Sequence, residues 1–189
     1  AAGAAREMAA PRILVYPWAL GVVSQGNPEQ IRAAIRRAKE QGADGLKLRE
    51  NLDRDQLEAA LDEAHRQGLR VAAHIGYEET TARDYAELGV DSIEHFYGVP
   101  DAATDGIQDF PPSLNISDGL QKFGQAAAEA FIHDAVNRAK LSAVLELMAR
   151  NHVSWSPTFS VYSANRDLLR AQNLPWFRDY LHPATEEFW

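Results

Sequence analysis

Three titratable residues, Lys47, His74 and His95, each follow a short apolar stretch of the sequence. A lone histidine in such a place is more often structural than functional, but two at matching places in successive stretches reverse that expectation. Neutral imidazole is the commonest nitrogen ligand of zinc and similar ions. We therefore predict that His74 and His95 bind one metal ion together.

Lys47 is the more specific of these clues. An ammonium group has three donors and no lone pair, so Lys47 binds a cation only when it is neutral or modified. Burial lowers the pKa of a lysine, and the neutral amine can add carbon dioxide to become a carbamate, in effect a carboxylate able to bridge two metals. The same amine can instead attack a carbonyl group and form a Schiff base. A structural ion pair with Asp44, Glu50 or a neighbour in the sheet is the third interpretation.

The elements that must position these side chains follow a repeated pattern. A glycine able to end a helix in the left-handed conformation stands five or six residues before each of them, at Gly42, Gly68 and Gly89. The apolar residues between glycine and titratable residue are typical of buried strands. These predicted strands cover residues 46–48, 71–74 and 92–95. Parallel strands present their last residues on one rim, where α/β folds build their sites.

Capping signals predict the helices between these strands. Asn27 with Pro28 and Gln30 starts the first helix, Asp53 caps the second, and a threonine at 80 or 81 opens the third. Alternation of strand and helix at about 25 residues a unit specifies parallel strands joined by right-handed crossovers.

The remaining chain adds two strands, a loop and a helix. Residues 12–17 are predicted as a buried strand by their β-branched and aromatic content, and residues 153–157 as the last strand. Residues 98–124, rich in Pro, Asp, Ser and Gly, are predicted as a long loop. Helical sequence runs from about residue 125 to Arg150, with a break near Lys140.

Five parallel strands define the predicted fold class as α/β. A complete eight-stranded barrel typically takes about 250 residues. The chain is therefore predicted to be a partial (β/α)8 TIM barrel whose other strands lie outside this sequence, or alternatively a five-stranded doubly wound sheet. We expect residues 1–189 to be the central portion of such a barrel domain, with the loop at about 98–124 inserted in it.

Composition excludes several classes of protein. The 189 residues are 46% hydrophobic and 24% charged, which is ordinary for one globular domain. A net charge of −8 argues against a nucleic-acid partner, and no apolar run approaches the roughly 20 residues of a membrane helix. The absence of cysteine excludes thiolate metal sites. We expect a soluble protein of the bacterial cytoplasm or periplasm with a small-molecule substrate. Whether it forms a homo-oligomer is left open.

Four segments together resemble the amidohydrolase superfamily, in particular its imidazolonepropionase-like and Xaa-Pro-dipeptidase-like branch. They are GADGLKL, VAAHIG, SIEHFYG and the SPT at residues 156–158. The resemblance covers nearly the whole chain, from the third to beyond the seventh barrel strand. It implies that Lys47 is a carboxylated, metal-bridging lysine at the fourth strand, and that His74 and His95 are metal ligands at the fifth and sixth.

The sequence also departs from that family. The family carries a His-x-His pair on its first strand and a metal-binding aspartate on its eighth, and neither is identifiable here. Asp167 and Asp179, the only aspartates after Pro157, lie in tail sequence, and Gly76 stands where many members have a second histidine. We therefore expect this chain alone to lack part of the site.

The predicted function is metal-dependent hydrolysis of an amide or related C–N or ester bond by a metal-activated water, with one or two divalent ions, most simply zinc. Arg49, Tyr77 and Tyr97 follow strand ends, where they are candidates to orient a substrate carboxylate or carbonyl; packing is the equal alternative. Glu94 alternates with His95 and is expected in the helix layer. The rival functions are a Schiff-base lyase or aldolase using Lys47, and a non-catalytic half-barrel binding module or inactive fragment.

Overall fold

The computed structural model describes residues 12–17, 26–49, 52–75, 80–96, 98–103, 135–160 and 173–175. The chain divides into two compact units, residues 1–156 and 157–189. The described elements of the first unit are, in order, α2 (Pro28–Glu40), β1 (Gly45–Arg49), α3 (Arg54–Arg66), β2 (Arg70–His74), α4 (Ala82–Glu87), β3 (Ser92–Glu94), the 3-10 helix η1 (Asp101–Ala103), α6 (Ala135–Arg150) and β4 (Ser154–Ser156).

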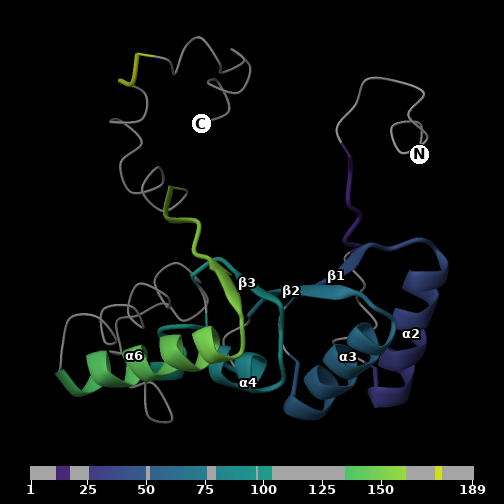
Figure 1. The fold of residues 1–189 in the computed structure, drawn as a ribbon, viewed down its shortest axis with the longest axis horizontal. Coiled ribbons are helices and arrows are strands. Elements are labelled where there is room, and N and C mark those ends of the chain that lie inside the picture. Colours follow the sequence, from purple (N-terminus) through teal and green to yellow (C-terminus); the bar gives the residue numbers. More distant parts are fainter. Residues whose placement is uncertain are drawn as a thin grey trace, which may run out of the picture. The chain divides into compact units, whose positions relative to one another are not determined.

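The four strands form one parallel sheet in the order β1-β2-β3-β4. The helices α2, α3, α4 and α6 all lie on the same side of this sheet (Figure 1). A doubly wound sheet would reverse its strand order and carry helices on both faces. The α/β class with parallel strands is thus confirmed, and the four described strands are consistent with a partial barrel or with one half of a doubly wound sheet.

The helix-covered face of the sheet forms the core. Strand residues alternate between the two faces, so every second strand residue is buried under the helices. These buried strand residues are Leu46, Leu48, Val71, Ala73 and Ile93. They meet the apolar stripes of the helices, which include Ile31, Ile35, Leu57, Leu61 and Tyr85. Each leucine, isoleucine or valine among them contributes about 1.5–3 kcal/mol when it is fully buried.

The predicted helix ends are confirmed. Asn27 and Gln30 form a reciprocal capping box at the start of α2, and Asp53 forms the same box with Gln56 at the start of α3. Thr81 is the cap of α4. The glycine that follows each of these three helices has a positive φ, between 68 and 91 degrees, as a left-handed helix end requires.

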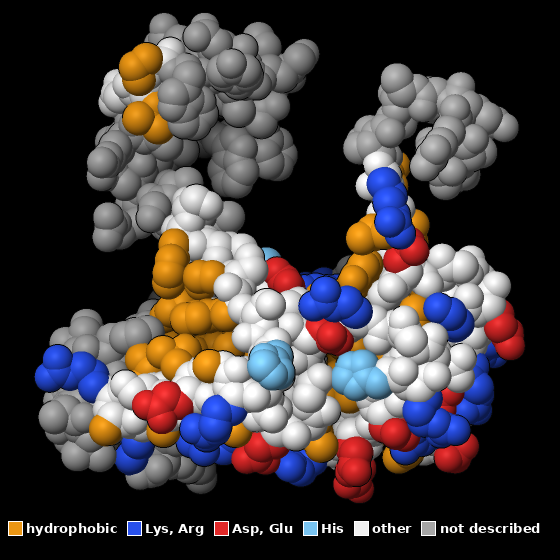
Figure 2. Space-filling view, in the orientation of Figure 1, with side chains coloured by type: hydrophobic (Ala, Val, Ile, Leu, Met, Phe, Trp, Pro, Cys, Tyr) orange, Lys and Arg blue, Asp and Glu red, His pale blue; other side chains and the backbone are white. Residues whose placement is uncertain are grey.

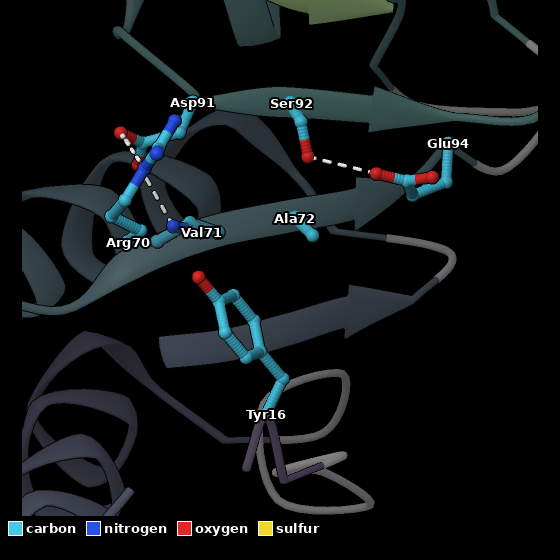
Figure 3. Close-up of a pocket in the computed structure, with 7 residues that line it drawn as sticks. All are labelled: Tyr16, Arg70, Val71, Ala72, Asp91, Ser92 and Glu94. Carbon is cyan, nitrogen blue, oxygen red and sulfur yellow. Dashed lines mark hydrogen bonds and ion pairs between the residues drawn. The ribbon is translucent and has the colours of Figure 1, made fainter. Parts of the chain in front are cut away.

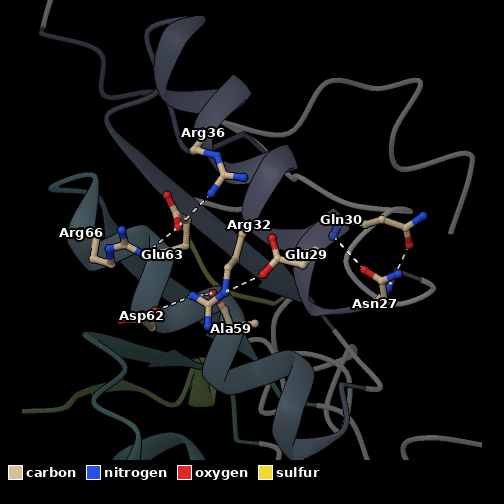
Figure 4. A network of polar contacts seen from close by, with 9 residues as sticks. All are labelled: Asn27, Glu29, Gln30, Arg32, Arg36, Ala59, Asp62, Glu63 and Arg66. Atoms are coloured by element: carbon tan, nitrogen blue, oxygen red, sulfur yellow. Dashed lines mark hydrogen bonds and ion pairs between the residues drawn. The ribbon is translucent and has the colours of Figure 1, made fainter.

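A buried carboxylate joins α2 to α3. The side chain of Glu63 is 1% exposed and accepts hydrogen bonds from Arg36 at 3.2 Å and Arg66 at 3.4 Å (Figure 4). It also accepts a hydrogen bond from Gln67 at 2.8 Å. An ion pair between Arg32 and Asp62 lies beside it, at a more exposed position. Charged side chains of both signs interleave over this end of the molecule (Figure 2).

Residues 12–17 were predicted as a buried strand, and this is wrong. The carbonyls of Val15 and Pro17 accept hydrogen bonds from the N–H groups of Asp44 and Lys47, at 2.9 and 3.3 Å. A parallel ladder would also need the N–H of residue 17, which proline lacks, and the N–H of Val15 donates instead to the Asp44 carboxylate at 2.8 Å. The segment therefore lies along β1, but only its carbonyl groups, and not its N–H groups, make the hydrogen bonds of a parallel ladder.

The same segment is exposed as well as irregular. The exposed fractions are 73% for Ile13, 52% for Leu14 and 52% for Val15. Within the described residues no helix packs over these side chains in the way that α2 and α3 pack over β1. Backbone hydrogen bonds to β1, rather than burial, therefore hold these residues beside the sheet.

The last predicted helix and strand are present with changed details. Helix α6 runs unbroken from Ala135 to Arg150, so the break predicted near Lys140 is wrong; β4 covers the centre of the predicted last strand. Of the predicted loop at 98–124, residues 98–103 form a turn and η1, and the rest lies outside the described residues.

No described helix is long and apolar enough to cross a bilayer.

Candidate active site

The open face of the sheet, opposite the helices, carries the charged strand residues. The strand register sets Arg49 beside His74 and His74 beside Glu94. Lys47 lies on the same face, two residues before Arg49 on β1. Because the strands are parallel, the predicted residues of β1 and β2 reach the same rim of the sheet.

His95 reaches this rim by a different route from the one predicted. The strand β3 ends at Glu94, and His95 has a left-handed backbone with φ of 68 degrees. Its ring then meets the ring of His74 edge to face, with centroids 4.9 Å apart. A non-glycine residue in this conformation costs of the order of 1 kcal/mol or more, and such residues cluster at functional sites.

Strand β4 holds His95 in this strained position. The N–H of His95 donates to the carbonyl of Ser156 at 2.8 Å, and the indole Nε1 of Trp155 donates to the carbonyl of His95 at 2.7 Å. Both backbone polar groups of His95 are therefore satisfied by one neighbouring strand. The predicted last strand thus fixes the backbone of His95 at the rim, through one backbone carbonyl and one indole.

A cavity of about 350 Å³ lies at this rim, lined by Tyr16, Lys47, Arg49, His74 and His95. Four of the six predicted site residues are brought together here. The other two, Tyr77 and Tyr97, lie outside the described residues, so their placement stays a prediction. Tyr16 was not predicted as a site residue.

The cavity environment lowers the pKa of two of its lining groups. Partial burial is the main cause for Lys47, with a smaller contribution from the Arg49 charge, while the Glu94 carboxylate opposes the shift. The pKa of His95 is lowered first by burial and then by the charges of Lys47 and Arg49, again against Glu94. Both shifts favour the neutral form, in which a nitrogen lone pair is available.

Glu94 lies on the open face, so its predicted place in the helix layer is wrong. The side chain is half-buried, and the Ser92 hydroxyl donates to its Oε1 at 2.8 Å. The prediction assumed that the strand continued through His95, which would put neighbours on opposite faces. The left-handed turn at His95 removes that alternation, and both side chains stay on the open face.

The described residues fit a metal ion only in part. No group of three His, Asp or Glu side chains with the spacing of a metal site is found among them. His74 and His95 supply two adjacent imidazoles, and neutral imidazole is a good ligand for zinc. On this rim the third donor would be Lys47 in its carbamate form.

Comparisons with known proteins give a distant structural likeness. No family model and no curated protein match the chain. Among solved structures, the chain is similar to AH, the bottromycin amidohydrolase, with a TM-score of 0.45 and 15% identity over 93% of this chain and 55% of that one. The chain thus spans about half the length of that protein.

Proposed function

We propose that the protein is a metal-dependent hydrolase that cleaves an amide or a related C–N or ester bond of a small molecule. The observation that carries this proposal is the rim cavity, in which Lys47, His74 and His95 meet from three adjacent parallel strands. The motif order that resembles the amidohydrolase superfamily supports the same activity.

His74 and His95 would hold the metal through their ring nitrogens, and Lys47 would join them as a carbamate. Partial burial favours the neutral amine of Lys47, whose nitrogen can attack the carbon of carbon dioxide, form a new N–C bond and release a proton. A bound divalent ion lowers the pKa of its water to about 7 and polarises a carbonyl. Arg49, at the exposed side of the cavity, would orient a substrate carboxylate or carbonyl.

The direct test compares two lysine substitutions. Lys47→Met keeps the length and apolar stem of the side chain but cannot form a carbamate, and Lys39→Met changes an exposed lysine in the last turn of α2. In the full-length protein, hydrolysis of a panel of N-acyl amino acids with added zinc should be lost in the first variant and retained in the second. Hydrolysis that survives both Lys47→Met and a chelator would overturn the proposal.

A Schiff-base lyase or aldolase is the second candidate. It is favoured by the same lowered pKa of Lys47, because a neutral amine is also the nucleophile that attacks a carbonyl group. Borohydride with a panel of small aldehydes and ketones should then label Lys47 covalently, with or without a chelator, and leave Lys39 unlabelled. If neither hydrolysis nor labelling occurs, a non-catalytic binding module is the function that is left.

A further inference from the structure

Tyr16 belongs to two cavities on the open face of the sheet. One is the rim cavity with Lys47, Arg49, His74 and His95. The other, of about 280 Å³, lies toward the starts of β2 and β3 and is called the inner cavity below (Figure 3). Besides Tyr16 it is lined by Arg70, Val71, Ala72, Asp91, Ser92 and Glu94. Tyr16 is the residue that these two linings share.

The position of the Tyr16 ring depends on a glycine in β1. Gly45 is buried, and a Cβ added to it would overlap the Tyr16 ring. The ring therefore occupies the space that a side chain at position 45 would fill on the open face. Figure 3 shows the ring extending across β1, with its hydroxyl directed toward Val71. The aromatic ring thus stands between the rim cavity and the inner cavity.

The inner cavity has small or short side chains where the ring ends. Ala72 presents only a methyl group, and Ser92 only a hydroxymethyl group, between the two cavities on β2 and β3. The Asp91 carboxylate accepts hydrogen bonds from the N–H of Val71 at 2.8 Å and from Arg70 at 3.3 Å. These bonds fix Asp91 at one side of the inner cavity, so it does not block that cavity. Among the described residues, the Tyr16 ring and the half-buried Glu94 side chain are the large groups at this boundary, and the ring is the one that lines both cavities.

We propose that Tyr16 sets the depth of the rim cavity and makes it selective for substrates with a short group on the inner side. This rests on the proposed function, because it concerns the substrate of that cavity. Removal of the ring would join the inner cavity to the rim cavity. A longer acyl group would then fit without displacing any residue that touches the reacting bond.

The test uses the full chain, a size series and three variants. Tyr16→Ala removes the ring, Tyr16→Phe keeps it and removes only the hydroxyl, and Leu14→Ala changes an exposed residue of the same segment that lines neither cavity. Hydrolysis of N-acylglycines from acetyl to hexanoyl is measured with zinc. Binding of the corresponding free acids, from acetate to hexanoate, is measured by calorimetry on the same proteins.

In Tyr16→Ala the ratio of kcat/KM for hexanoyl over acetyl should rise by at least about tenfold, and hexanoate should gain affinity relative to acetate. Tyr16→Phe and Leu14→Ala should keep the wild-type ratios. Three outcomes would overturn the inference. The first is an equal ratio in Tyr16→Ala and wild type, and the second is a shift in Tyr16→Phe as large as in Tyr16→Ala. The third is that no acid binds to any of the proteins. If no protein hydrolyses the substrates but Tyr16→Ala still gains affinity for hexanoate relative to acetate, only the proposed function is contradicted.

Discussion

The imidazole rings of His74 and His95 meet edge to face, with centroids 4.9 Å apart and planes inclined by 67 degrees. His74 is the last residue of β2 and His95 follows β3, and the strand register alone would not bring them together. The contact forms because His95 leaves β3 in a left-handed conformation that β4 stabilises from the side. The pairing of the two candidate ligands is therefore built by three strands.

Replacing Trp155 by Phe should weaken zinc binding without unfolding the chain. The indole Nε1 donates to the His95 carbonyl at 2.7 Å, and phenylalanine keeps an aromatic ring beside Phe96 while losing this donor. Loss of a group that orients a metal ligand typically costs about 10- to 100-fold in affinity. Competition with a chromophoric chelator measures the change. An unchanged affinity in a folded Trp155→Phe protein would show that His95 needs no such support.

Glu63→Ala should destabilise the chain more than Asp62→Ala, its neighbour on α3. Glu63 is 1% exposed and accepts three side-chain hydrogen bonds, whereas Asp62 makes a partly exposed ion pair with Arg32. We expect a loss of about 2–3 kcal/mol for the first, because it removes three hydrogen bonds made by a buried charged group. The second should lose less than about 1 kcal/mol. Urea unfolding measures both, and equal losses would contradict the stabilising role of the buried carboxylate.

The stability of the protein should fall between about pH 10 and pH 12 because of Tyr85. Burial, helped by the nearby Asp84 carboxylate, raises the pKa of Tyr85 from 10.0 to about 12. Its oxygen makes no hydrogen bond of good geometry within the described residues, although Thr80 lies close enough to oppose the rise in pKa. In this window the unfolded chain releases the phenol proton and the folded chain keeps it.

The sign of the Tyr85 effect follows from that difference. Stability is fully present below the unfolded pKa and is lost as the pH rises through the folded pKa, by about 2–3 kcal/mol in total. Tyr85→Phe should remove this loss and change stability little at neutral pH, since it deletes a hydroxyl without a well-formed partner. Denaturant midpoints of both proteins across pH 9 to 12 should therefore diverge; parallel curves would contradict the burial of an ionisable phenol.

The sequence could predict the part of the fold that local chemistry decides. Capping residues such as Asn27 and Asp53 and the helix-ending glycines act on backbone groups within one turn, so their positions mark helix ends directly. Apolar runs between those ends define the strands, and hence the rim that carries Lys47 and His74. These features need no knowledge of distant contacts.

The features that were missed depend on contacts between distant segments. The left-handed backbone of His95 depends on bonds from β4, about 60 residues later, and it brings His95 to the open face on which the strand register already places Glu94. Tyr16 enters the cavity only because Gly45 leaves space beside it. The signal that was available is the glycine itself, since a glycine inside a strand often marks the close approach of another group.

The central claim, that His74 and His95 bind one divalent ion together, is tested most directly by metal content. Wild-type protein loaded with zinc and desalted is compared with His74→Ala, His95→Ala and the control His65→Ala, which changes an exposed histidine on α3. We predict bound zinc in the wild type and in His65→Ala, and its loss in both rim variants. A wild-type chain that retains no divalent ion, or rim variants that retain as much as the control, would contradict the claim.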